Sequence, residues 1–386
     1  MHVIRHVRIQ HIRVMLPGPR GAQQRGSMPP TRALAGMRKT RVMLVIHVEC
    51  IAVEEHAIGI IEAAEGWCDV KVRTVVHITD TMEFMKIHVC GEGLVDLVPV
   101  APGSLQDLTP ALGGGPFNVA ITAARLGGEV NFQSRLSTDG FGNALVEWLE
   151  QEGVDTSMVQ RGPEPTTLAV TSIGDDGSAS YTFYTEGTAD RLVEPALSDA
   201  EIACFGTVSL ALEPGASRYG ELLKRFAAKG SIVALDPNIR PFYANDEHKA
   251  FLNELLAHVT VLKLSEEEVE FLGKQALKQV PVVVVTRGGE GLALRAGTTR
   301  LEVPSVKVDV ADTIGAGDTI MGALLTEIAR RNLTAEELTH LSEYDWKQIL
   351  EFAAAAAAIT VSHKGAQPPH RAEVLAMQAD AQKKEA

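Results

Sequence analysis

The chain has 386 residues, of which 45% are hydrophobic and 22% are charged, and its formal net charge is −13. This is the composition of a globular protein with enough apolar material for a large core, in one or two domains. The acidic balance argues against nucleic-acid binding through general basicity, because neutralising phosphates requires clustered Lys and Arg. A small-molecule partner fits this composition better.

The cysteines and the apolar runs bear on the location of the protein. The sequence shows neither CxxC nor Cys/His ligand spacing, so it predicts neither a zinc site nor a disulfide framework, and a reducing cytoplasm is the expected compartment. The four cysteines are Cys50, Cys68, Cys90 and Cys204. No apolar run approaches the roughly 18 residues that span a bilayer, so we expect no membrane partner.

The first 84 residues differ from the rest of the chain. From Met1 to Arg41 there are many Arg and Lys residues and no Asp or Glu, and the whole region lacks a clear helical or strand period. A transit peptide is one interpretation, although such peptides are usually rich in Ser. We expect residues 1–84 to be a non-native or disordered extension, residues 85–372 to form the folded domain, and residues 373–386 to be a charged tail.

From Met85 onward, strand-like and helix-like segments alternate. An apolar strand over 86–98 precedes helices over 118–127 and 141–153, and two β-rich runs flank the turn "GDDG" at 174–177. Further helices are expected over 221–230, 251–259 and 346–363, and further strands over 231–238, 260–265, 281–286 and 303–310. This order predicts an α/β fold with a mostly parallel sheet covered by helices on both faces, which the hairpin leaves as a small flap.

The stretch "DTIGAGD" follows the last expected strand and precedes an amphipathic helix. Small residues at Gly315, Ala316 and Gly317 let a ligand approach the backbone, and the free N–H groups of a first helical turn attract anions. An aspartate at such a site is useful if Asp318 takes a proton from a hydroxyl that then attacks a bound phosphoryl group. The alternative is that Asp318 or Asp312 only caps the helix.

A second glycine cluster, "LGGGPFNVA" over 112–120, also precedes a helix. Asn118 near the start of that helix could hydrogen-bond a polyhydroxylated ligand, for which Gly113 and Gly114 leave room. The cluster does not match GxGxxG, and the chain has no GxxxxGK[ST] phosphate loop. A nucleotide enzyme with this sequence must therefore bind phosphate in another way.

The two clusters, in this order and at this separation, resemble the two signatures of the PfkB, or ribokinase-like, family of sugar and nucleoside kinases. The resemblance extends from Met85 to about Pro369. It implies a ribokinase-like three-layer α/β/α fold, with a small β lid formed by about 94–112 and 165–188. It also implies ATP and Mg²⁺ as cofactors, with K⁺ activation frequent in the family.

The resemblance assigns roles to individual residues. Asp318 would be the catalytic base, with the backbone of the turn at 315–318, which is Gly315, Ala316, Gly317 and Asp318, as the anion hole. The acceptor side would be formed by Asp96, Gly114, Asn118, Tyr184 and Arg240. Phe183 is an alternative to Tyr184 for packing against the sugar, and Arg240 would lie near the triphosphate unless it forms a salt bridge at a strand end.

The nucleotide side follows from the same resemblance. ATP would lie by Lys263, Thr286, Gly288, Gly291 and Gly365. Glu268 matches the glutamate of the family's NxxE motif, which helps to place Mg²⁺ through water, although Ser265 stands where the motif has Asn. A K⁺ site beside Asp312 is a further implication.

The acceptor is the least determined part of the prediction. The segments 181–193 and 236–241 resemble those of bacterial fructokinases, so fructose ranks first. Kinases for the acid sugar 2-keto-3-deoxygluconate usually neutralise its carboxylate with an Arg close after the lid Tyr, whereas Thr185 and Glu186 follow Tyr184 here. This acceptor, or another ketose, therefore ranks second. Ribose or a nucleoside ranks third, because the chain has only 5% aromatic residues from which to build a base platform.

Two further alternatives concern the assembly and the activity. Family members often dimerise through their lids, so a homodimer is an expectation from the resemblance alone. A catalytically silent sugar-binding regulator is the alternative to an enzyme. Such a protein would be expected to lack the base or the glycines, whereas Asp318, Gly315 and Gly317 are all present.

Overall fold

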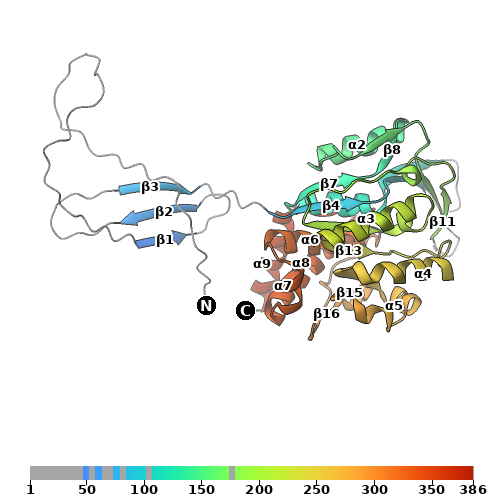
Figure 1. Cartoon of the computed structure of the whole chain (residues 1–386). Helices are drawn as coiled ribbons and strands as arrows, with labels where there is room; N and C mark the ends of the chain where they lie inside the picture. Colours follow the sequence, from blue (N-terminus) through green and yellow to red (C-terminus); the bar gives the residue numbers. More distant parts are fainter. Residues whose placement is uncertain are drawn as a thin grey trace, which may run out of the picture. The chain divides into compact units, whose positions relative to one another are not determined.

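The structure is a computed structural model, and it describes residues 47–51, 57–62, 73–78, 84–100, 107–173 and 179–385. Contacts within the chain divide it into two units, Met1–Glu83 and Phe84–Ala386. The described part of the first unit is an antiparallel sheet in the order β1-β2-β3 (Figure 1). Its strands are β1 (His47–Ile51), β2 (Ala57–Glu62) and β3 (Arg73–Ile78). The sequence analysis missed these strands, because their apolar runs are short and do not alternate regularly.

The second unit is built on a sheet in which the described residues form eight strands, in the order β17-β16-β15-β14-β13-β12-β4-β7. Every neighbouring pair from β15 to β7 is parallel, and β16 and β17 are antiparallel at one edge. All residues of β12 and β13 are buried, which accounts for their apolar sequence up to Asp236 at the end of β13. The strands are β4 (Lys86–Cys90), β7 (Glu129–Gln133), β12 (Ile202–Gly206), β13 (Ile232–Asp236), β14 (Val261–Ser265), β15 (Val282–Thr286), β16 (Leu292–Ala296) and β17 (Thr299–Val303).

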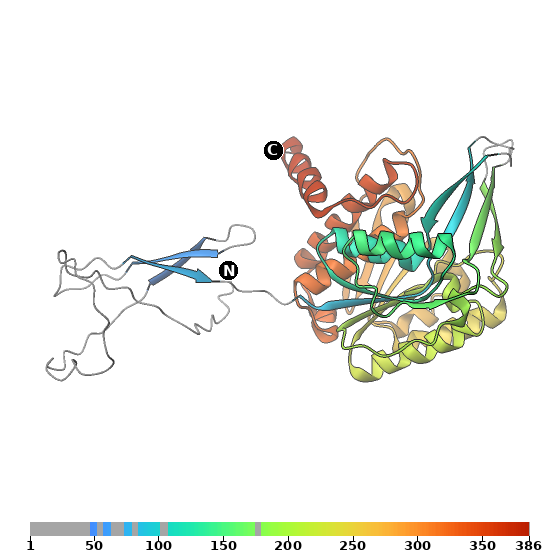
Figure 2. The ribbon, with the colours of Figure 1, turned by 90° about the horizontal axis from the view of Figure 1, so that it is seen from above.

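Helices cover both faces of this sheet (Figure 2). One apolar core contains buried side chains of α1 (Gly115–Arg125), α2 (Gly140–Gln151), α6 (Ala316–Arg330) and α8 (Glu343–Val361). The other contains those of α3 (Gly215–Lys229), α4 (Asp246–Leu255) and α5 (Glu266–Leu272). Gly322 lets α6 approach α1 closely, since a Cβ there would lie 2.7 Å from Cβ of Thr122. The predicted three-layer α/β/α fold is confirmed.

A smaller sheet stands at one end of the second unit, and we call it the lid (Figure 2). Its described strands lie in the order β11-β10-β5-β6, with β10 and β5 parallel and the other pairs antiparallel. They are β5 (Leu94–Pro99), β6 (Leu108–Gly113), β10 (Leu168–Ile173) and β11 (Ala179–Tyr184). The predicted hairpin corresponds to β10 and β11, while its turn "GDDG" lies outside the described residues.

Two predicted strands differ from the structure. The expected strand over 86–98 is broken after Cys90, so that β4 lies in the main sheet and β5 in the lid. Gly91 makes the break with φ 148°, and a Cβ there would lie 2.3 Å from Cγ of Pro116. The expected strand over 303–310 is wrong: β17 ends at Val303, and the next residue is Pro304, which has no N–H to donate to a ladder.

The predicted charged tail is helical. Residues Arg371–Glu385 form α9, which packs against α8 through the fully buried Val374. A short helix, α7 (Ala335–His340), precedes α8. In the described part of the chain, no helix has the length and hydropathy of a membrane span.

Candidate active site

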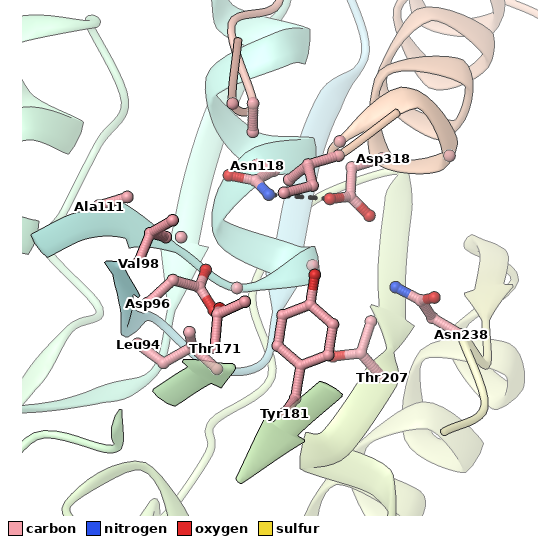
Figure 3. A pocket seen from close by; sticks show the side chains of 18 of the residues that line it. Leu94, Asp96, Val98, Ala111, Asn118, Thr171, Tyr181, Thr207, Asn238 and Asp318 are labelled. Carbon is pink, nitrogen blue, oxygen red and sulfur yellow. Dashed lines mark hydrogen bonds between the residues drawn. The ribbon is translucent and has the colours of Figure 1, made fainter. Parts of the chain in front are cut away.

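A cavity of about 770 Å³ lies where the lid meets the carboxyl ends of β12 and β13. The amino-terminal ends of α1 and α6 and the segment 364–366 complete its wall. Figure 3 shows side chains of the lid, of α1 and of α6 around this space. The carboxyl ends of the strands are where open parallel sheets bind ligands, because the chain leaves the sheet there in loops and helix starts.

Asp318 lies in the first turn of α6, is 6% exposed and lines the cavity. The side chain of Asn118, from the first turns of α1, donates a hydrogen bond to Oδ2 of Asp318 at 2.8 Å (Figure 3). Burial and the nearby charge of Asp236 raise the pKa of Asp318 to about 6, against the opposite effects of Asn118, Lys263 and Arg240. The carboxylate is therefore ionised at neutral pH and basic enough to accept a proton from a positioned hydroxyl.

The turn before Asp318 leaves room for an anion. Gly315 is the N-cap of α6 with φ 79°, and among the described residues no side chain caps this helix end. A Cβ at Gly317 would lie 2.7 Å from Nζ of the buried Lys263, so the turn runs directly past an ammonium group. Gly315 and Gly317 line the cavity, whereas Ala316 is not among its lining residues and donates its N–H to the carbonyl of Thr313 at 3.3 Å.

The helix-cap alternative does not fit this geometry, because Gly315 occupies the N-cap position. Asp312 has a different contact. Its Oδ1 accepts the N–H of Ile314 at 3.1 Å and its Oδ2 accepts the N–H of Gly365 at 2.9 Å. Asp312 thereby ties the turn before α6 to the loop after α8, and both Asp312 and Gly365 line the cavity.

The acceptor side of the cavity contains four of the five predicted residues. Asp96 of β5 is half-buried, and burial raises its pKa to about 6 although Arg240 opposes the shift. Gly114, with φ 110°, precedes α1, and a Cβ there would lie 2.8 Å from the carbonyl oxygen of Glu92. Asp96, Gly114, Asn118 and Arg240 all line the cavity.

The fifth predicted residue, Tyr184, lies elsewhere. It is 59% exposed and is not among the lining residues, whereas Tyr181 and Phe183 of the same strand are. Successive side chains of a strand point to opposite faces, so positions 181 and 183 share the cavity face and 184 does not. Of the two aromatic residues considered from the sequence, Phe183 therefore reaches the cavity. Its ring stacks on Phe242 with centroids 4.6 Å apart.

The predicted nucleotide residues divide into two groups. Gly365 lines the cavity. Thr286 at the end of β15, and Gly288 and Gly291 in the connection from β15 to β16, are not among the lining residues. Thr286 donates its hydroxyl to the carbonyl of Leu264 at 3.3 Å. Gly291 also meets a packing need, since a Cβ there would lie 2.1 Å from the carbonyl oxygen of Val303.

Lys263 and Glu268 are not among the residues that line the cavity. Lys263 is 4% exposed, and its Nζ is 2.8 Å from Oδ2 of Asp236. Glu268 forms a capping box with Ser265 at the start of α5: its Oε2 accepts the N–H of Ser265 at 2.7 Å, and its Oε1 accepts the N–H of Ile239 at 2.6 Å. The described residues contain no group of three or more His, Cys, Asp or Glu arranged to hold a metal ion.

The sequence analysis did not single out several polar residues of the cavity. They are Glu92, Thr171, Tyr181, Thr207, Asn238 and Tyr243. Thr207 follows β12 directly with φ 61°, and Asn238 stands two residues after the end of β13 with φ 45°. The available signal was a polar residue placed just after a fully apolar strand, because such positions meet at the carboxyl edge of a parallel sheet.

Comparison with known proteins places this cavity in a family. The model of the pfkB family carbohydrate kinase matches residues 85–373. A fructokinase of Rhizobium leguminosarum bv. trifolii is 34% identical over 274 residues, which are 66% of this chain and 83% of the relative. Fructokinase-1 of rice, Oryza sativa subsp. japonica, is 33% identical over 311 residues, which are 74% of this chain and 95% of the relative.

A solved structure agrees with these relatives. The fructokinase of Xylella fastidiosa with bound ATP superposes with a TM-score of 0.72 at 29% identity, covering 77% of this chain and 99% of that chain. The family match spans almost the whole of the second unit and includes the turn with Asp318, the glycine cluster before α1 and the lid. The protein is thus a member of the pfkB carbohydrate kinase family and a sugar phosphotransferase.

Proposed function

We propose that the protein transfers the γ-phosphoryl group of ATP to a hydroxyl of fructose. The observation that carries the proposal is the position of Asp318, buried at the uncapped start of α6 and hydrogen-bonded to Asn118 in the same cavity as Asp96. Fructose as the acceptor is supported by the relatives named fructokinases and by the segments 181–193 and 236–241.

The proposed chemical step uses one base. Asp318 accepts the proton of the attacking hydroxyl while the sugar oxygen forms its bond to the γ-phosphorus and the bond to the β-phosphate oxygen breaks, leaving ADP and the protonated carboxyl. General-base catalysis of this kind contributes about 10²–10⁴ in rate. The N–H groups at the start of α6 and the nearby ammonium of Lys263 would stabilise the transferring phosphoryl group, since alignment and charge stabilisation dominate phosphoryl transfer.

The turn at 315–318 fits a phosphate group, because it opens a helix that no described side chain caps and it runs past the ammonium of Lys263. ATP would supply the phosphoryl group, with Lys263 near the turn and Gly365 held beside the turn by Asp312. Thr286, Gly288 and Gly291 remain our prediction for the rest of the nucleotide, as does the placement of Arg240 near the triphosphate.

Mg²⁺ would accompany ATP, neutralise charge on its phosphate oxygens and keep several of its own waters. The predicted contact of Glu268 through water is compatible with its geometry. Two backbone N–H groups use two of the roughly four acceptor positions of a carboxylate, so acceptor capacity remains. A K⁺ ion beside Asp312 would lie where this side chain joins the turn before α6 to Gly365. A homodimer through the lid also remains a prediction.

A riboside is the second candidate acceptor, and one observation favours it. Tyr181 and Phe183 bring two aromatic rings to the cavity, with centroids 6.4 Å apart. Such a wall can pack against a base as well as against the apolar face of a sugar. The acid sugar 2-keto-3-deoxygluconate remains less favoured, and the silent regulator becomes the leading alternative only if no acceptor reacts.

The test is coupled release of ADP from the full chain with ATP and Mg²⁺. Fructose, 2-keto-3-deoxygluconate, ribose, glucose and adenosine are compared as kcat/KM, because this ratio measures discrimination. We expect fructose to lead by at least about tenfold, equivalent to about 1.4 kcal/mol. A higher kcat/KM with another acceptor would contradict fructose as the substrate but would leave the assignment of Asp318 as the base intact. No ADP with any acceptor, with fructose still protecting the protein from thermal unfolding, would favour the regulator.

A further inference from the structure

Glu92 is a buried carboxylate in the wall of the cavity, and the proposed transfer step does not use it. It lies between Gly91 and Gly93, where the chain passes from β4 to β5, and is 1% exposed. Its carboxylate oxygens accept hydrogen bonds from the hydroxyls of Thr207 and Ser209, and Oε2 also accepts the N–H of Ser209 at 3.2 Å. Both oxygens are therefore committed to the segment that follows β12.

The segment held by Glu92 is strained. Thr207 has φ 61°, a left-handed conformation that a β-branched residue rarely adopts. Residues in such conformations persist only where their surroundings hold them, and they gather at functional sites. The hydroxyl of Thr207 is fixed by Glu92, and the next residue but one, Ser209, is fixed by the same carboxylate. Glu92 thus supplies the contacts that keep Thr207 in this conformation.

Thr207 in turn shapes the acceptor side of the cavity. A Cβ at Gly115 would lie 2.2 Å from Cγ2 of Thr207, so the methyl group of Thr207 packs directly against the start of α1. Three residues further on in α1 is Asn118, the hydrogen-bond partner of Asp318. Thr207, Gly115 and Asn118 all line the cavity, and Figure 3 shows Thr207 and Asn118 at its wall.

We propose that Glu92 is a positioning residue for the acceptor: it holds Thr207 against Gly115, and thereby sets the shape of the pocket that receives the sugar. The inference rests on the proposed function, because it takes the cavity between α1 and the lid as the sugar site. It predicts that loss of the Glu92 contacts weakens binding of the acceptor and leaves binding of ATP unchanged.

The charge environment of Glu92 supports a role that depends on these hydroxyls. Among the described residues, no Lys or Arg forms an ion pair with it. Burial raises the pKa of Glu92 to about 7, the two hydroxyls oppose this rise, and the carboxylate of Asp190 adds to it. Without the hydroxyls of Thr207 and Ser209, no side chain would donate a hydrogen bond to the buried charge of Glu92. The Glu92 carboxylate and the segment after β12 therefore stabilise each other.

The test compares steady-state kinetics of the full chain carrying Glu92→Gln or Ser209→Ala, with Glu221→Gln on the exposed face of α3 as the matched control. The glutamine keeps the size of the side chain but cannot accept both hydroxyls with both terminal atoms. We expect Glu92→Gln to raise the KM for fructose about tenfold, equivalent to about 1.4 kcal/mol, and to leave the KM for ATP within about twofold. Ser209→Ala should give a smaller rise in the same KM, and the control none.

A Thr207→Gly background separates positioning through Thr207 from loss of stability. Glycine adopts the left-handed conformation without strain but lacks the methyl group that packs against Gly115, so the fructose KM of the double variant Glu92→Gln/Thr207→Gly should equal that of Thr207→Gly alone. An unchanged fructose KM in folded Glu92→Gln, or an equal rise in both KM values, would overturn the inference. If Glu92→Gln does not fold, the same comparison on Ser209→Ala decides. Failure of the proposed function would be seen separately, as a wild-type protein that neither binds nor phosphorylates fructose.

Discussion

Replacing Asp318 by Asn should reduce turnover and raise stability at the same time. The substitution keeps the size of the side chain and removes the base, so kcat should fall by about 10²–10⁴. Binding of ATP should persist, because the glycines of the turn and Lys263 are unchanged. The pKa of Asp318 is raised from 3.8 to about 6 in the folded protein, so its ionised form is disfavoured by folding. A difference of this size corresponds to about 3 kcal/mol.

The sign of the stability effect depends on pH. Below about pH 3 the carboxyl is largely protonated in both the folded and the unfolded chain, and at pH 4 ionisation of the unfolded chain has only begun to lower stability, so the aspartate carries little penalty. As pH rises to about 6 the unfolded chain ionises first, which lowers the stability of the wild-type protein. Asp318→Asn should therefore raise Tm by roughly 5 °C at pH 8, and the difference should shrink toward pH 4.

The assay combines ADP release, calorimetric binding of ATP and thermal unfolding at pH 4 and pH 8. Asp199→Asn is the control, because Asp199 is fully exposed and lies outside the cavity. It should change neither turnover nor Tm. Turnover within tenfold of wild type for Asp318→Asn would refute the base assignment. A fall in turnover with equal loss of ATP binding would show that the side chain supports the nucleotide site instead.

Four further outcomes can be checked with the same assay. The value of kcat/KM should rise with pH and level off above about pH 6, since Asp318 must be ionised, and a profile flat down to pH 5 would contradict this. Gly317→Ala should abolish most turnover, because the new Cβ would lie 2.7 Å from the buried ammonium of Lys263. An unchanged kcat would show that close approach of the turn to Lys263 is not needed for transfer. Phe183→Ala should raise the fructose KM while Tyr184→Ala leaves it unchanged. The reverse result would contradict the assignment of the Phe183 face of β11 to the sugar site. A chain beginning at Met85 should keep full activity, since the family match starts there; inactivity would show that the first unit is needed.

Much of the fold could be predicted because its core strands are buried on both sides. Segments such as 232–235 and 282–285 are continuous apolar runs, a pattern that few other arrangements produce. The site near Asp318 could also be predicted, because the chemistry of a helix start and of small residues is local. Both predictions depend on neighbours in the sequence.

The parts that could not be predicted depend on neighbours in space. The apolar run from Lys86 onward continues through Gly91, and only the close approach of Pro116 shows why the chain must turn there. Phe183 and Tyr184 are equally aromatic, and their roles differ only through the register of β11. Glu92 looks like an ordinary turn residue until the segment after β12 is brought against it.

Three buried or half-buried carboxylates converge on the cavity, and burial is the largest cause of the raised pKa in Glu92, Asp96 and Asp318. Each of them has lost water that would otherwise donate hydrogen bonds to it. Glu92 recovers donors from protein hydroxyls and Asp318 recovers one from Asn118. Asp96 has no comparable donor among the hydrogen bonds of the described side chains, and a polyhydroxylated acceptor would supply one. The free energy that folding loses at this carboxylate is therefore available to binding, and it favours a ligand rich in hydroxyl groups over one of the same shape without them.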